Sequence, residues 1–183
     1  IDSIETHTKL TELEISRSSV EDISALRNLT ALRVFKITNS NVKEISSLEN
    51  LHELVWLDLE GNQIDDLSPL RDLSKIRFLI LRDNQIVDLS PLADLNALES
   101  LFLENNNIVD IQPLERRGYY IFDVHLRNNS ISDISSLEHL RVADLDLRAN
   151  PLSDIRGLLN MPRHHGLEHL FSIKISEPVD PNQ

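Results

Sequence analysis

Apolar residues recur along this chain with a period of 22 residues. Two successive units agree in residue type at eight positions, seven of which are Leu or Ile and one of which is Asn. The matched positions are Leu54, Leu57, Leu59, Asn62, Ile64, Leu67, Leu70 and Leu73, followed by Ile76, Leu79, Leu81, Asn84, Ile86, Leu89, Leu92 and Leu95. A fixed period of this length predicts a solenoid, in which each unit buries its apolar face by stacking on its neighbours.

Seven units of 21 to 23 residues follow this register over residues 1–161, which we interpret as one solenoid domain. The first unit starts in mid-repeat at Ile1 rather than at Met, so we expect a processed form or a piece of a longer protein. An extra residue shifts the register within 115–120. Residues 162–183 are expected to form a terminal partial repeat and a polar tail. One last strand is predicted by the apolar residues Leu170, Ile173 and Ile175.

Each unit predicts a strand, a turn and a short return segment. The Leu-x-Leu alternation is typical of a strand with one buried face, and strands that recur with the same polarity must pair in parallel. The return segment reads Asp-Leu-Ser-Pro-Leu at 66–70 and 88–92, where about eight residues leave room for only a 3₁₀ or single α turn. The expected architecture is therefore a curved parallel sheet of about eight strands, backed by short turns.

A column of asparagines marks the turn that follows each strand. Because an amide carries donors and an acceptor, stacked Asn side chains can satisfy the backbone groups that the bend leaves without partners. Serines can do this only in part, so we expect weaker turns in the first two units. The column comprises Ser18, Ser40, Asn62, Asn84, Asn106, Asn129 and Asn150.

A column of acidic residues precedes each return segment. Its members are Asp22, Glu44, Asp66, Asp88, Asp110, Asp133 and Asp154. Stacked carboxylates could bind calcium, but that ion needs six or more oxygen ligands around one point, and a single column supplies few. We therefore interpret these residues as caps of the turns that follow them.

The consensus Leu-x-x-Leu-x-Leu-x-x-Asn-x-Ile-x-Asp-Leu-x-x-Leu-x-x-Leu resembles the leucine-rich repeat family. The 22-residue period with Asp-Leu-Ser-Pro-Leu resembles its bacterial internalin-like branch, which is related to the regulatory subunit of type-1 protein phosphatase. The resemblance implies an α/β solenoid: a right-handed superhelix with a parallel concave β-sheet and short 3₁₀ or α turns on the convex side. It also implies protein binding on the concave face. The helical N-terminal cap and the immunoglobulin-like module of internalins are not seen in the sequence.

The water-facing positions of the predicted strands carry an unusual apolar cluster. Trp56 and Phe78 should nearly touch, because neighbouring strands lie about 4.8 Å apart. An apolar centre with a charged rim is the anatomy of a protein interface, and Trp is enriched among residues that dominate binding energy. The alternatives are cross-strand packing that only stabilises the sheet, or cover of the cluster by a terminal segment. The candidate partner-binding residues are Val34, Lys36, Trp56, Asp58, Phe78, Ile80, Arg82, Phe102, Glu104 and Arg127.

Composition narrows the functional classes further. The formal net charge of −12 argues against nucleic acid as a partner and favours a soluble monomer. No cysteine is present, which excludes disulfides and cysteine-ligated zinc. The sequence also has no apolar run of about 18 residues, so we expect no insertion into a membrane. The compartment stays open, with a bacterial cell surface or secreted setting favoured over the cytoplasm.

Three other features carry weaker hypotheses. His165 and His169 have the spacing of two metal ligands on one helical face, with His164 beside them, but Pro162 and Gly166 weaken any helix there. The insertion at 116–120 is a possible second contact site. No set of residues supports catalysis, so we predict no enzyme activity, no metal and no cofactor. The favoured function is a protein-interaction module, and the alternative is a structural spacer or docking segment of a larger protein.

Overall fold

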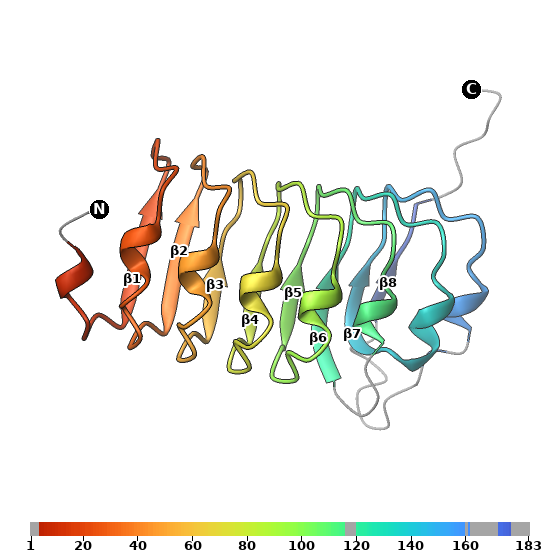
Figure 1. The fold of residues 1–183 in the computed structure, drawn as a ribbon. Helices are drawn as coiled ribbons and strands as arrows, with labels where there is room; N and C mark the ends of the chain where they lie inside the picture. The colour runs from red at the N-terminus through yellow and green to blue at the C-terminus, as the bar shows by residue number, and fades with distance from the viewer. Residues whose placement is uncertain (1–3, 116–119, 160, 162–171, 177–183) are drawn as a thin grey trace.

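Eight strands form one parallel sheet in chain order. The structure is a computed structural model that describes residues 4–115, 120–159, 161 and 172–176. Each strand pairs only with its sequence neighbours, from β1 at one edge to β8 at the other (Figure 1). The strands are β1 (Glu12–Ser16), β2 (Val34–Thr38), β3 (Trp56–Asp58), β4 (Phe78–Ile80), β5 (Ser100–Phe102), β6 (Tyr120–His125), β7 (Arg141–Asp146) and β8 (Ser172–Lys174). The predicted solenoid and its strand number are confirmed.

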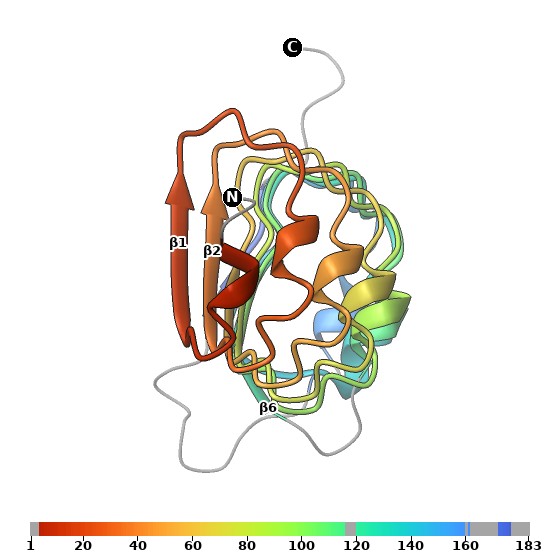
Figure 2. The same cartoon turned by 60° about the vertical axis from the view of Figure 1, so that its left-hand side comes forward.

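Short 3₁₀ turns form the opposite side of the solenoid. Figure 2 shows the sheet on one side of the molecule and the turns on the other. Pro69, Pro91 and Pro113 occupy first-turn positions, where a missing backbone N–H costs nothing. The turns are η1 (Ile4–Thr6), η2 (Ser24–Leu26), η3 (Ser46–Leu48), η4 (Ser68–Leu70), η5 (Ser90–Leu92), η6 (Gln112–Leu114), η7 (Ser135–His139) and η8 (Arg156–Leu158).

The core lies between the sheet and the turns and is continuous from Ile23 to Met161. The register brings equivalent residues of successive units side by side, as in the pairing of Leu57 with Leu79. The two ends of the stack are exceptions: Leu13 and Ile15 of β1 and Ile173 of β8 are only partly buried, while their equivalents in the units between are fully buried. A unit at the end of a stack has a neighbour on one side only.

The asparagine column forms the predicted ladder of hydrogen bonds. The Asn84 amide donates to the carbonyls of Leu59 (2.9 Å) and Leu81 (3.2 Å), and its oxygen accepts from the N–H of Ile64 (3.0 Å). Each Asn thereby ties its own turn to the preceding unit. The same pattern is made by Asn62, Asn106, Asn129 and Asn150.

The two serines that replace Asn form fewer hydrogen bonds than the asparagines do. Their hydroxyls bond to each other at 2.8 Å, and Ser18 accepts from the N–H of Val20 at 3.4 Å. Ser40 donates to the carbonyl of Thr38 within its own unit. Because the hydroxyl of a serine is too short to reach the backbone of the preceding unit, the two serines replace Asn only in part, as expected.

The acidic column caps the 3₁₀ turns. Asp66 accepts the N–H of Ser68 at 2.8 Å, two residues along the chain. Glu44, one methylene longer, is the exception among the described members of the column. The equivalent bond is made by Asp22, Asp88, Asp110, Asp133 and Asp154. Within the described residues there is no group of three His, Cys, Asp or Glu side chains that could hold a metal ion, and no helix long and apolar enough to cross a membrane.

Candidate protein-interaction face

The face of the sheet that points away from the core, here called the open face, carries all the candidate binding residues. It corresponds to the predicted concave face. Strand pairing aligns Val34, Trp56 and Phe78 in one row, and Lys36, Asp58, Ile80 and Phe102 in the row beside it. The predicted side-by-side arrangement is confirmed. Arg82, Glu104 and Arg127 follow β4, β5 and β6 and form a third row along the strand ends.

One half of the open face is aromatic. The rings of Trp56 and Phe78 stack with centroids 4.9 Å apart and an interplanar angle of 29°. The Phe102 ring meets the His125 ring edge-on at 5.0 Å. We call Val34, Trp56, Phe78, Ile80 and Phe102 the aromatic half; its members are partly buried rather than fully exposed. Strands spaced by about 4.8 Å bring such rings into contact without any further constraint.

Cationic side chains lie over the rings of the aromatic half. The Lys36 ammonium is 5.6 Å from the Trp56 ring centre, and the Arg82 guanidinium is 4.4 Å from that of Phe102. Arg77, which directly precedes β4, lies 5.7 Å from the centre of the Phe78 ring. Such contacts are attractive because the face of an aromatic ring is electron-rich. They also explain why the aromatic side chains are partly covered.

The predicted charged rim is present and is internally paired. Arg82 lies between two acids, with Glu104 at 2.9 Å and Glu60 at 3.6 Å. Asp58 lies within the aromatic half, where burial raises the pKa of its carboxyl despite a hydrogen bond from the N–H of Glu60. Arg127 is exposed at the edge of the face.

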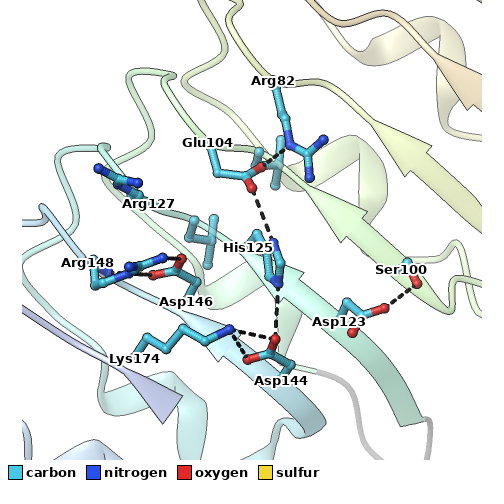
Figure 3. Close-up of polar contacts among 12 residues, drawn as sticks. Arg82, Ser100, Glu104, Asp123, His125, Arg127, Asp144, Asp146, Arg148 and Lys174 are labelled. Carbon is cyan, nitrogen blue, oxygen red and sulfur yellow. Dashed lines mark hydrogen bonds and ion pairs between the residues drawn. The ribbon is translucent and has the colours of Figure 1, made fainter. Parts of the chain in front are cut away.

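The other half of the open face is polar and centres on His125 (Figure 3). Its Nδ1 lies 3.2 Å from Glu104, and its Nε2 lies 3.5 Å from Asp144 of the next strand. Asp144 in turn pairs with Lys174 of β8 at 2.7 Å. In addition to the backbone pairing, these side-chain contacts form a continuous series from the end of β5 to β8. Strand phase also places His125, Asp144 and Asp146 on this face, but the site predicted from the sequence includes none of them, nor Lys174.

The charges of the polar half shift the ionisation of its members. The hydrogen bond to Glu104 raises the pKa of His125, and the nearby charge of Asp144 acts in the same direction. Burial opposes ionisation of Glu104, but hydrogen bonds from His125 and Arg82 outweigh it and lower the pKa of that carboxyl. Asp146, only 4% exposed, is held by both guanidinium donors of Arg148. The hydrogen bonds and ion pairs of the polar half thus hold its charged side chains in fixed positions.

Two further sequence features lie wholly or largely outside the described residues. The histidines at 164, 165 and 169 fall there, as does the insertion apart from its last residue, Tyr120. Tyr120 begins β6 and contacts Phe122 edge-on at 5.0 Å, beside Arg141 of β7. The metal and second-contact hypotheses for these segments stay predictions.

Comparison with known proteins agrees with this architecture. Two family models match, described as "Leucine rich repeat" over residues 8–64 and "Leucine Rich repeats (2 copies)" over residues 74–116. The structure of internalin C2 from Listeria monocytogenes is 31% identical and superposes with a TM-score of 0.84, covering 96% of this chain and 75% of that one. The chain belongs to the leucine-rich repeat family.

Other solved structures extend the likeness. A second Listeria monocytogenes internalin, internalin F, is also 31% identical, with a TM-score of 0.78; the match covers 96% of this chain and 56% of that one. A plant leucine-rich repeat receptor kinase ectodomain, GASSHO1/SCHENGEN3 from Arabidopsis thaliana, has 22% identity and a TM-score of 0.74 over 87% of this chain and 21% of that one, and so shares the fold. A search of curated proteins finds no match. Leucine-rich repeat proteins are in general protein-interaction modules.

Proposed function

We propose that this leucine-rich repeat protein is a non-enzymatic module that binds a partner protein on the open face of its sheet. The observation that carries the proposal is the placement of Trp56, Phe78 and Phe102 on three consecutive strands, pointing away from the Leu core. In the other strands the equivalent positions are mostly polar. An aromatic centre within a charged rim is what a protein interface requires.

The contacts within the aromatic half support a pre-formed surface. Stacking on Phe78 and the cation of Lys36 hold Trp56 in one orientation. A partner therefore meets side chains that have already lost their conformational freedom, which reduces the entropy cost of binding. The rim charges would act mainly on association rate and salt dependence.

A structural spacer is the second candidate, and one observation favours it. The aromatic side chains are partly buried and pack on one another, as cross-strand pairs that stabilise a sheet do. Under this hypothesis the stacking serves the fold and needs no partner. The predicted relation to the regulatory subunit of type-1 protein phosphatase, and the predicted monomer on a bacterial surface, fit either use.

The binding module and the structural spacer predict different effects on partner affinity when aromatic side chains of the aromatic half are removed. We would use the parent protein and the variant Trp56→Ala/Phe78→Ala as parallel baits, identify proteins retained by the parent, and measure each affinity by titration calorimetry. Val87→Ala/Val109→Ala is the matched control, because both valines are about half exposed and lie in the turns after the Asn column. The proposal predicts affinity lost by about 2 kcal/mol or more in the aromatic variant alone. Equal affinities for folded parent and aromatic variant would favour the spacer.

A further inference from the structure

Two partly buried carboxylates on the open face have no direct contact with a cation of the described residues. Asp58 and Asp123 form no ion pair with any residue in the described part of the chain, although four of the cations on this face are paired. Those cations use other acids: Lys36 with Glu14, Arg82 with Glu60 and Glu104, Arg148 with Asp146, and Lys174 with Asp144. Lys36 and Arg82 act on the Asp58 carboxylate from a distance but do not contact it. Asp58 and Asp123 are therefore two carboxylates of the open face that no cation of the described residues contacts directly.

Within the described part of the chain, each of these carboxylates accepts one hydrogen bond. Asp58 accepts the backbone N–H of Glu60 at 3.1 Å through Oδ1. Asp123 accepts the hydroxyl of Ser100 at 2.8 Å through Oδ2 (Figure 3). One oxygen of each group is therefore left for another donor. Both side chains are partly buried, so neither is an ordinary solvated surface acid.

The two carboxylates lie on either side of Phe78, Ile80 and Phe102, with Asp58 on β3 and Asp123 on β6. Asp58 is the cross-strand neighbour of Lys36 and Ile80, and so lies beside the Trp56–Phe78 stack. Asp123 lies one strand beyond Ser100, which itself pairs with Phe78. A partner that covers the aromatic rings must also remove water from both acids. Burying a carboxylate without a matching cation or donor is costly, and burial already raises the pKa of Asp58.

We infer that the contact segment of the partner carries an apolar side chain between two cationic side chains, which pair with Asp58 and Asp123. This inference rests on the proposed function and specifies the chemistry of the partner at that site. The apolar side chain packs on the Phe78, Ile80 and Phe102 surface. A lysine or arginine on each side supplies the missing positive charge.

The spacing of the two acids sets the spacing of the two cations. From β3 to β6 there are three interstrand steps of about 4.8 Å, and Asp123 lies two residues before His125, which is the residue in register with Asp58. The two acids are therefore roughly 16 Å apart. An extended chain rises about 3.3 Å per residue, so four residues span about 13 Å, and the length of a lysine or arginine side chain covers the remainder. In such a segment the cations stand at positions i and i+4 and the apolar residue at i+2. All three point to the same side, because side chains of a strand alternate.

A defined probe tests this arrangement without a known partner. A displayed library of disulfide-closed β-hairpins, randomised at i, i+2 and i+4 on one face, is selected on the parent protein, with Trp56→Ala used to remove hairpins that bind elsewhere. Retained hairpins are then titrated into Asp58→Asn, Asp123→Asn and Asp94→Asn. Asn keeps the oxygen that accepts from Glu60 or Ser100, so the first two variants should fold. Asp94 is exposed on the turn side and controls for the loss of one negative charge.

The inference predicts Lys or Arg at i and i+4, an apolar residue at i+2, and affinity at least tenfold weaker for Asp58→Asn and Asp123→Asn but unchanged for Asp94→Asn. Trp56-dependent hairpins without cationic preference, or with affinity insensitive to both substitutions, would overturn this inference while leaving the proposed function standing. If no hairpin depends on Trp56, the aromatic half is not a binding surface and both proposals fail.

Discussion

The two faces of the sheet differ in how far they follow the repeat. On the core face Leu57, Leu79 and Leu101 are identical and fully buried in three successive strands. One residue further along, the open face carries Asp58, Ile80 and Phe102. Stacking requires the same side chain in every unit, whereas recognition of a partner requires different ones. The repeated positions thus stabilise the fold, and under the proposed function the positions that differ between units determine which partner binds.

The largest expected effect lies on the core face. Leu79→Ala removes a fully buried side chain in the middle of the stack and should lower the free energy of unfolding by about 2–5 kcal/mol. Leu159→Ala is the control, because this leucine is 79% exposed and its truncation should change little. Urea unfolding followed by circular dichroism measures both. Equal stabilities for the two variants would show that the repeat does not mark the core.

The asparagine ladder should come next. Asn84→Ala leaves the N–H of Ile64 without its acceptor and removes one of the two amide donors to the carbonyl of Leu59, which should cost about 1–3 kcal/mol of unfolding free energy. The complementary variant Ser40→Asn restores an amide in the second unit and should stabilise the N-terminal end. Hydrogen exchange of the amide of Ile64 locates the loss in Asn84→Ala. A parent-like melting curve would contradict the role of the ladder.

The smallest expected effect is the pH dependence of the polar half. The raised pKa of His125 means that its contribution to stability is fully present below the unfolded pKa of about 6.5 and is lost as pH rises through the folded pKa. The effect should be below about 1 kcal/mol, as for a partly exposed ion pair. The unfolding free energy of the parent should fall relative to His125→Gln between pH 6 and 9. Parallel curves would refute the Glu104–His125–Asp144 linkage.

The sequence predicted the repeated features and missed those that depend on side-chain reach. Strand register, the Asn ladder and the contact of Trp56 with Phe78 all follow from residues one period apart. Asp144 and Lys174 are 30 residues apart in the sequence, and the 22-residue pattern is lost between them, so the period could not indicate their ion pair. Strand phase likewise shows which way Phe102 points, but not that the Arg82 guanidinium lies over its ring. Long flexible side chains are placed by their neighbours, and a repeat consensus does not encode them.

The central claim is that adjacent residues on the two faces of the sheet have different roles, and β3 tests it most directly. Unfolding free energy and calorimetric affinity for the partner would be measured for Trp56→Ala and Leu57→Ala side by side. Trp56→Ala should stay within about 1.5 kcal/mol of the parent in stability, the size of a lost aromatic pair, and bind about 2 kcal/mol more weakly. Leu57→Ala should lose about 2–5 kcal/mol of stability, and its folded fraction should bind like the parent. If Trp56→Ala is destabilised as much as Leu57→Ala and keeps parental affinity, the open face serves the fold and the claim is contradicted.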